Sequence, residues 1–372
     1  MFRAPLALSL ALSLLVATPA FAAVSLHVGA ETVLADPAPL SYALAVGGET
    51  PVLAWSEPAF GTARILVAPV ERLERAVELP LRTPGAMAGQ PAILFDRDGY
   101  IVTWVETIAG VQTAVALRLD RDLHPLTVLP VALTSAPASR QLERPRIVHA
   151  DGSPAIAWNY VLVRDDGAAL PYDYAAGAVP VTITANNVRV LVLQNAIQPA
   201  RCNFFPPIFC TPAQVALDAR VFHGGVFLIP LTLAARQAAP WAEVTAAAGR
   251  DGFLAVWRDA TGPIEAVQIA NNGAAGQRIV LGNGSEATDL AAAGDGSLFV
   301  VLWNEVTGPL ARGLVLRAIT SRGVSEPVAL GRDLSAAQLV PLGGERMLLL
   351  YRRGTQLVAR AIAEPARVRV TR

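Results

Sequence analysis

The residues whose types and spacing are suited to chemistry are carboxylates that follow aromatic side chains. They occur in Trp55-Ser-Glu57, Trp104-Val-Glu106 and Trp303-Asn-Glu305, and Asp259 follows Trp257 in a similar way. Paired carboxylates are the acid and base groups of glycoside hydrolases. A catalytic pair should be an exception to a repeat, whereas these acids recur with it. We therefore interpret them as structural groups that form turns or hydrogen-bond neighbouring repeats.

Two acidic turns, Asp96-Arg-Asp98-Gly99 and Arg164-Asp-Asp166-Gly167, resemble the start of a calcium loop. Such a loop also needs further oxygen ligands and a closing bidentate Glu, so we interpret both as plain turns. The four histidines, His27, His124, His149 and His223, lack the short spacing of a zinc-binding helix. His223-Gly-Gly has no G-x-S-x-G partner for esterase chemistry. We predict no catalytic, cofactor-binding or metal-binding residues.

Cys202 and Cys210 are the two cysteines of the chain. In an oxidising compartment an isolated close pair indicates a disulfide, and the alternative of a redox-active pair lacks the C-x-x-C spacing. The pair lies in a segment, residues 166–212, that interrupts the repeat described below. This segment also holds a possible contact loop, made of Tyr172, Tyr174, Phe204, Phe205 and Phe209. Apolar residues on a stapled loop indicate a contact surface; the alternative is that they pack onto the adjacent repeat.

The N-terminal residues predict export. A single Arg3 precedes the apolar run Leu6–Val16, and Ala20-Phe-Ala22 is typical of a signal-peptidase site, so we expect residues 1–22 to be a signal peptide. The remaining 23–372 are expected to form one domain with no membrane span. Formal net charge is zero, which gives no indication of nucleic acid as a partner. The absence of lysine and the abundance of alanine are typical of a GC-rich bacterial genome. We expect a monomeric periplasmic or extracellular protein.

One unit recurs along the chain: an apolar strand, a tight Gly turn and a second apolar strand that ends in an aromatic residue. The aromatic positions are Trp55, Trp104, Trp158, Trp257, Trp303 and Tyr351. Their spacings run from 46 to 54 residues, apart from one gap of 99. Asp98-Gly99 and Asp251-Gly252 are typical of hairpin turns that need positive φ. With two more strands per unit, the pattern predicts an all-β fold, a β-propeller of four-stranded antiparallel blades.

Two features of this propeller stay open. The long gap between Trp158 and Trp257 holds strands for a further blade, which gives seven blades, or an added hairpin and loop, which gives six; seven is slightly favoured. The last blade is completed either by residues 29–36, beside residues 356–362, or by residues 366–370. The recurring aromatics are either sugar platforms or packing groups between blades, and their repetition in every unit favours packing.

The Trp-ended strand after a Gly turn, in tandem units of about fifty residues, resembles the repeat of exported bacterial β-propeller proteins. The resemblance implies architecture only, because most such proteins have no assigned activity. Three functions remain: a non-enzymatic recognition scaffold that binds a protein or glycan, a glycan-active hydrolase or lyase with its site at the propeller channel, and a structural module of an envelope assembly. The first is our leading hypothesis, and it requires no cofactor.

Overall fold

The computed structural model describes residues 24–363, except for residues 40, 47–49, 60–61, 139–143, 151, 159–160, 171–178, 200, 203–209, 225, 228–229, 237–240, 242, 260–261, 284–286 and 309–310. The predicted signal peptide lies outside the described residues. The described part consists of strands and turns, with one short 3-10 helix at Val70–Arg75. In this part no helix is long and apolar enough to cross a membrane. The all-β prediction is confirmed.

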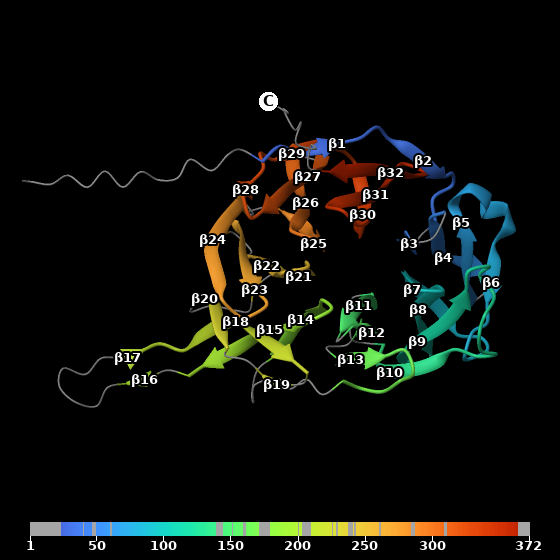
Figure 1. Cartoon of the computed structure of the whole chain (residues 1–372), viewed down its shortest axis with the longest axis horizontal. Helices are drawn as coiled ribbons and strands as arrows, with labels where there is room; N and C mark the ends of the chain where they lie inside the picture. Colours follow the sequence, from blue (N-terminus) through green and yellow to red (C-terminus); the bar gives the residue numbers. More distant parts are fainter. Residues whose placement is uncertain are drawn as a thin grey trace, which may run out of the picture.

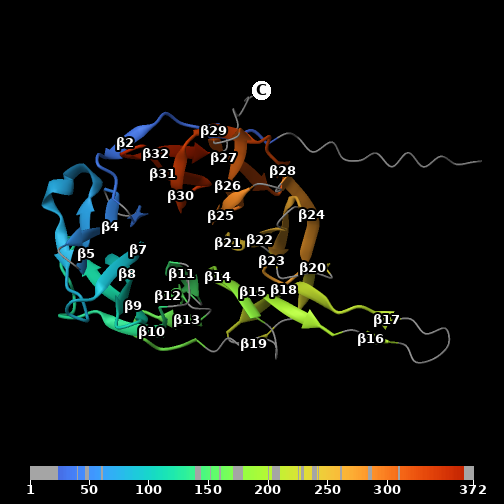
Figure 2. The same cartoon turned by 180° about the vertical axis from the view of Figure 1, so that it is seen from behind.

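The sheets are arranged as a ring around a central opening (Figures 1 and 2), which is the β-propeller architecture. Among the described residues, five sheets have four or more strands and form blades of the ring. The first is an eight-stranded sheet of β3 (Ser41–Ala45), β4 (Val52–Ala59), β5 (Thr62–Pro69), β6 (Val77–Leu79), β7 (Met87–Asp96), β8 (Gly99–Ile108), β9 (Val111–Asp120) and β10 (Val131–Pro137). A three-stranded sheet follows, with β11 (Arg146–Ala150), β12 (Ser153–Trp158) and β13 (Val161–Arg164).

The second half of the ring contains the other four large sheets. One contains β14 (Val179–Ala185), β15 (Val190–Gln198), β18 (Gln214–His223), β19 (Val226–Phe227) and β20 (Leu231–Arg236). The next contains β21 (Glu243–Ala248), β22 (Gly252–Arg258), β23 (Ile264–Ala270) and β24 (Ala275–Gly282). It is followed by β25 (Thr288–Asp295), β26 (Leu298–Gly308), β27 (Ala311–Thr320), β28 (Gly323–Val324) and β29 (Val328–Arg332). The last contains β30 (Leu334–Pro341), β31 (Arg346–Arg353) and β32 (Gln356–Ala363), with β1 (His27–Val28) and β2 (Thr32–Ala35).

Strands from the two ends of the described chain close the ring. Both β1 and β2 pair antiparallel with β32, and Thr32 lies opposite Ala359. Of the two predicted modes of closure, the structure confirms the one through residues 29–36; residues 366–370 lie outside the described residues. The two N-terminal strands therefore supply the outer partner of β32 and join the two ends of the described chain in one sheet.

Part of the segment 166–212 belongs to the ring. Strands β14 and β15, which lie within it, form part of a full sheet and do not interrupt the ring. The interruption is instead a hairpin of β16 (Arg201–Cys202) and β17 (Cys210–Thr211), which is inserted between β15 and β18 and extends away from the ring (Figure 1). A hairpin inserted between two neighbouring strands leaves their pairing intact, and β15 and β18 pair over their full lengths.

The glycines of the hairpin turns serve two different purposes. Gly296 has a φ of +64°, as a primed turn requires. Gly99 and Gly252 do not have a positive φ, which corrects the sequence-based expectation for these two turns. A Cβ on Gly99 would lie 2.1 Å from the carbonyl oxygen of Leu119, and one on Gly252 would lie 2.2 Å from that of Ile269. These two positions therefore exclude side chains because the neighbouring strand approaches closely.

The recurring aromatic residues pack between sheets, as their repetition predicts. Trp104, Trp257 and Tyr351 have no solvent exposure, and Trp158 and Trp303 are almost fully buried. Trp303 belongs to a core cluster with Leu254 and Ile264 of the preceding sheet. Half-buried Trp55 packs against Leu350 and Leu357 of the last sheet, which continues the pattern across the closure of the ring. The aromatics are thus packing groups and not exposed sugar platforms.

Candidate functional site

The carboxylates that follow the aromatics are used for structure. Glu57 forms an ion pair with Arg64 at 2.7 Å, and Asp259 forms one with Arg236. Glu106 is buried and accepts hydrogen bonds from the backbone N–H groups of Arg82 and Thr83 and from the indole N–H of Trp104. Glu305 is half-buried and lies within β26. The interpretation as structural groups is confirmed for Glu57, Glu106 and Asp259.

The four histidines lie on separate strands and turns. His27 lies in β1 and His149 in β11, whereas His223 ends β18 and its Nδ1 contacts the Val188 carbonyl oxygen at 3.2 Å. His124 lies on the turn after β9, where it is close to Asp120 and Asp122. This trio is the one group in the described residues with metal-ligating atoms within 4.8 Å of one another. Two of its members are exposed, and the backbone N–H of His124 donates to the Asp120 carboxylate at 2.8 Å, which is a turn interaction.

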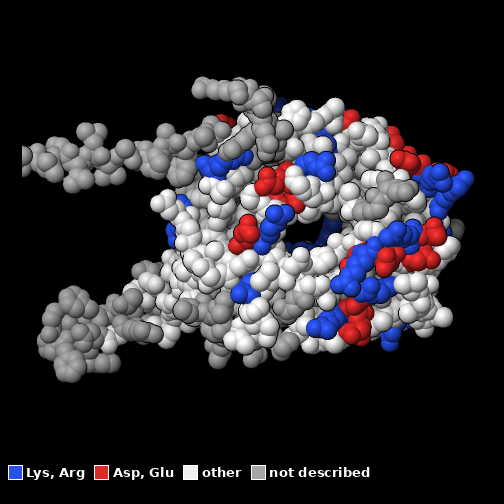
Figure 3. Space-filling model, viewed as in Figure 1, with Lys and Arg blue, Asp and Glu red and all other residues white. Residues whose placement is uncertain are grey.

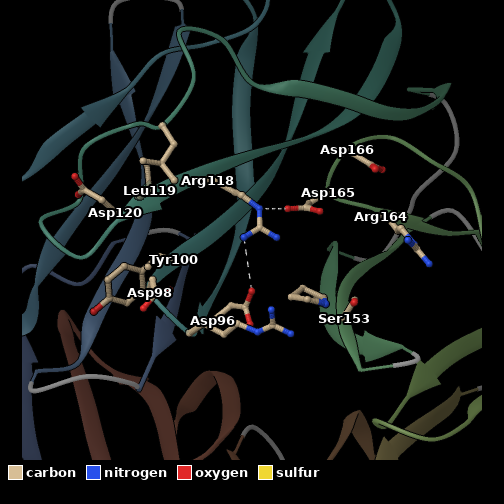
Figure 4. A pocket seen from close by; sticks show the side chains of 14 residues that line it. Asp96, Asp98, Tyr100, Arg118, Leu119, Asp120, Ser153, Arg164, Asp165 and Asp166 are labelled. Carbon is tan, nitrogen blue, oxygen red and sulfur yellow. Dashed lines mark hydrogen bonds and ion pairs between the residues drawn. The ribbon is translucent and has the colours of Figure 1, made fainter.

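The described part of the ring contains a cleft of about 560 Å³ on the face where the Asp-Gly turns lie. The β7–β8 turn and the end of β9 form one wall, and the β11–β12 and β13 turns form the other (Figure 4). Its lining is rich in charge: Asp96, Arg97, Asp98, Gly99, Tyr100, Arg118, Leu119, Asp120, Leu126, Ser153, Pro154, Arg164, Asp165 and Asp166. The cleft therefore brings together the two acidic turns that the sequence presents as separate features.

Arg118 joins the two walls of the cleft. Its guanidinium forms ion pairs with Asp96, at 3.6 Å, and with Asp165 from the opposite wall. Figure 4 shows Arg118 pointing between these two carboxylates. Both aspartate side chains are largely buried, at 11% and 16% exposure, whereas Arg118 is 46% exposed. The arginine thus presents a fixed, accessible cation that two shielded carboxylates hold in place.

The remaining lining groups have ordinary turn roles. Asp166 accepts a hydrogen bond from the backbone N–H of Ala168 at 2.8 Å, which confirms plain turn chemistry for this residue. Asp98 forms an exposed ion pair with Arg121 at 3.4 Å. The His124 backbone N–H lowers the pKa of Asp120 below its usual value, so this carboxyl stays ionised. A ligand in the cleft would meet guanidinium donors next to carboxylate acceptors.

Sequence reasoning identified both turns but not their convergence on Arg118. Arg118 belongs to the third strand of its blade, which carries no motif of its own. The recurrence of an Arg-Asp-rich turn in consecutive units, at residues 96–99 and 164–167, is the signal that would have placed both at one junction. The β7–β8 turn and the turn after β13 come from neighbouring sheets, and the cleft lies where these two turns meet.

The predicted contact-loop residues Tyr172, Tyr174, Phe204, Phe205 and Phe209 lie outside the described residues. The two cysteines lie in the hairpin that extends from the ring. There, Cys202 and Cys210 are register partners on β16 and β17, directly across the antiparallel pair. No cysteine of the described part is free.

The ring of antiparallel sheets, its buried aromatic repeat and its closure by the N-terminal strands define this protein as a β-propeller. No model of a known protein family matches the sequence. No curated protein matches it either.

Several solved structures are similar in fold. A neuraminidase-like protein of A/little yellow-shouldered bat/Guatemala has 10% identity and a TM-score of 0.43 over 92% of this chain and 99% of its own. The WD40 domain of SCAP from fission yeast has 8% identity and a TM-score of 0.42 over 88% of this chain and 85% of its own. A DUF4623 family protein from Bacteroides eggerthii has 10% identity and a TM-score of 0.39 over 92% of this chain and 77% of its own. These likenesses say nothing about activity.

Proposed function

We propose that this chain is an exported, non-enzymatic recognition scaffold, located in the periplasm or outside the cell, which binds a ligand through one face of the propeller. The observation that supports this proposal is the charged cleft around Arg118. Its volume of about 560 Å³ lies in the range of small-ligand sites, which is roughly 300–1,000 Å³. The two carboxylates that hold Arg118 fix its position before a ligand arrives, which lowers the ordering cost of binding.

Of the two ligand classes, we propose a glycan for this cleft. Sugar hydroxyls both donate and accept hydrogen bonds, and the lining provides five aspartates as acceptors and three arginines as donors. Protein partners need a much larger contact area, of about 800 Å² on each side. The hairpin that extends from the ring is the better candidate for a protein contact, with Phe204, Phe205 and Phe209 between its strands in the sequence.

A glycan array followed by isothermal titration calorimetry with the best ligand tests the proposal. We expect Asp165→Asn to weaken binding at least tenfold, because Arg118 loses the partner that fixes it across the cleft. Asp218→Asn is the matched control, since Asp218 accepts a hydrogen bond from Thr232 within the sheet of β18 and β20, which does not line the cleft. Unchanged affinity in Asp165→Asn, or no bound glycan at all, would contradict the proposal. Turnover of the bound glycan would instead favour the hydrolase or lyase alternative.

We also propose seven blades and membership of the exported bacterial propeller repeat proteins that the sequence resembles. The eight-stranded sheet supports this count because it contains two four-stranded units, β3–β6 and β7–β10, which one parallel bridge between Ala63 and Met87 joins. The gap between Trp158 and Trp257 contains the separate sheet of β14, β15 and β18. An experimental structure with six repeats of the four-stranded unit would refute the count.

We propose that Cys202 and Cys210 form the predicted disulfide. Their direct opposition on β16 and β17 supports this bond, because it places the two residues in the register of a cross-strand pair. The mature protein should resist alkylation by iodoacetamide until it is reduced, as measured by mass spectrometry. Alkylation of either cysteine in the folded, unreduced protein would contradict the bond.

A further inference from the structure

One wall of the cleft around Arg118 continues into a stretch of exposed apolar residues. Leu126 lines the cleft, and its backbone N–H donates to the carbonyl oxygen of Arg118 at 2.9 Å, so these two residues lie next to each other. Leu126 is 61% exposed, and Val128 and Leu129, in the same loop between β9 and β10, are 89% and 51% exposed. We call Leu126, Val128 and Leu129 the apolar patch.

The loop that carries the apolar patch is held by hydrogen bonds on both sides of it. Before the patch, Pro125 forms a bridge with β9. After it, the guanidinium of Arg82 donates to the carbonyl oxygen of Pro130 at 2.9 Å. Within it, the hydroxyl of Thr127 donates to the carbonyl oxygen of Leu129 at 3.0 Å. A backbone fixed in this way has little ordering cost to pay on binding, and it keeps the apolar side chains in contact with water.

The apolar patch differs from the other exposed apolar side chains of the described ring. Ile197 of β15 and Val280 of β24 are 67% and 59% exposed, but the residues on either side of each are not exposed apolar ones. Single residues of this kind are normal on a protein surface, whereas a continuous patch indicates a contact site. The sequence changes abruptly here: residues 118–124 contain two arginines, two aspartates and a histidine, and residues 125–133 contain no charged residue.

The surroundings of the apolar patch favour one kind of occupant. Figure 3 shows charged side chains of both signs gathered in a band beside the central opening, over the part of the ring that contains β7, β8 and β9. A protein partner or a second copy of the chain needs about 800 Å² on each side, far more than three side chains offer. An anionic membrane surface attracts arginines, but the cleft lining contains five aspartates and only three arginines. A ligand with a polar part and an apolar part fits both surfaces.

We propose that the apolar patch binds an aliphatic chain of the ligand whose sugar occupies the cleft, so that the ligand is a glycan with an alkyl or acyl substituent. This inference rests on the proposed function, because it takes the cleft as the sugar site. Leu126 belongs to both surfaces and joins them. Its Cα lies at most about 11 Å from that of Leu129, a distance comparable with the length of an octyl chain. Each methylene that is fully buried on the patch should raise the affinity about fourfold.

Methyl NMR spectroscopy of the mature protein, with labelled Ile, Leu and Val methyl groups, tests the apolar patch directly. The probes are octyl β-glucoside, kept below the concentration at which it forms micelles, and methyl β-glucoside. We expect octyl β-glucoside to shift the methyl signals of Leu126, Val128 and Leu129, and to bind at least tenfold more tightly than methyl β-glucoside. The methyl signals of Ile197 and Val280 serve as internal controls and should not move.

A double variant at the two patch residues outside the cleft lining provides a second measurement. Val128→Ser with Leu129→Ser should weaken octyl β-glucoside binding at least tenfold, whereas the matched control Val280→Ser should leave it unchanged. The inference is wrong if octyl β-glucoside leaves the three patch signals in place, if it moves Ile197 and Val280 equally, or if the double variant binds it as tightly as the unsubstituted protein. It is also wrong if the protein is a dimer that the double variant converts to monomers, because a second copy then covers the patch.

Failure of the proposed function gives a different pattern from failure of this inference. If no sugar occupies the cleft, Asp165→Asn leaves the binding of both glucosides unchanged while octyl β-glucoside still shifts the patch signals. The patch then remains a site for an aliphatic chain, and the assignment of the cleft is the part that fails. A glycan that binds in the cleft, together with patch signals that octyl β-glucoside does not move, refutes the patch alone.

Discussion

Replacement of Glu106 by Gln tests how a blade holds the linker that precedes it. Glu106 is 2% exposed, and its carboxylate accepts from the backbone N–H groups of Arg82, at 2.8 Å, and Thr83, at 2.9 Å. The indole N–H of Trp104 donates to the same carboxylate at 3.2 Å. Arg82 and Thr83 belong to the linker between β6 and β7, so one carboxylate joins a linker, a strand and the packing aromatic.

The expected loss of stability follows from the number of acceptors. A Gln side chain has one oxygen, so its amide NH2 group must face either the Arg82 or the Thr83 backbone N–H, and that donor loses its partner. An unsatisfied buried donor costs about 1–3 kcal/mol, and loss of the charge weakens the other bonds by about 1 kcal/mol. The free energy of unfolding should therefore fall by about 2–4 kcal/mol.

Glu265→Gln provides the matched control for this measurement. Glu265 accepts from the indole N–H of Trp257 at 3.0 Å and from exposed Arg278, but from no backbone donor. A single acceptor oxygen can keep the indole bond, so we expect a loss below about 1 kcal/mol. Urea unfolding followed by tryptophan fluorescence measures both variants. If Glu106→Gln destabilises the protein no more than Glu265→Gln does, the explanation of the linker clamp is wrong.

Two further perturbations test the turn and the ring closure. Gly99→Ala should lower the free energy of unfolding by more than about 3 kcal/mol, since its Cβ would lie 2.1 Å from the Leu119 carbonyl oxygen. Gly110→Ala, where φ is +78° and the space around the Cβ is open, should cost only about 1 kcal/mol in the same urea assay. Equal losses in the two variants would contradict the close-approach argument. The free energy of unfolding should fall above pH 10, because Tyr42 ionises near its usual pKa of about 10 in the unfolded chain but only near 12 in the folded one. The stabilisation by neutral Tyr42 is complete below pH 10 and is lost as the pH rises to 12. The expected loss is about 2–3 kcal/mol. Tyr42→Phe should remove the part of the fall that Tyr42 causes and leave that of Tyr351, whose pKa burial also raises to about 12; an unchanged pH profile would contradict the argument.

The repeat was predictable because it follows from local chemistry. Each unit places an aromatic residue where a neighbouring sheet must bury it, and Trp257 and Trp303 are indeed buried against the preceding sheets. Closure by residues 29–36 was also visible, since that segment resembles the outer strand of another unit. The sequence did not show why position 99 must be glycine. A turn rich in Asp and Gly has the same sequence whether its glycine adopts a positive φ or lies close to a neighbouring carbonyl oxygen.

The candidate site depends on contacts between distant residues, which no local pattern encodes. Arg118 meets Asp165 from the next sheet, 47 residues away. The rule that repeated acids are structural agrees with the contacts of Glu106, but it gave no indication that an unrepeated acid, Asp165, would pair with an arginine of the neighbouring sheet.

The innermost strands show how the ring accommodates irregular positions between its blades. In β7, β25 and β30 the pairing register shifts at one point, where residues of the strand have no partner opposite them. The first of these residues has a positive φ in each strand: Gln90, Asp289 and Ala336. None is glycine, so each position costs roughly 1 kcal/mol or more. At Asp289 the backbone N–H reaches Glu243 of the preceding sheet at 3.2 Å, and at Ala336 the carbonyl accepts from Tyr42 of the following one.

A regular strand would point these backbone groups at its own partner, where they could not reach a neighbouring blade. The bulge releases one N–H or carbonyl group from the ladder and turns it toward the next sheet. The strain at Ala336 is therefore compensated by a hydrogen bond that joins the last sheet to the first. The same tyrosine also binds Gln338 and Arg144 through its carbonyl oxygen. A substitution that removes the Tyr42 hydroxyl should therefore break the bond to Ala336 and leave the two bonds to the backbone carbonyl in place.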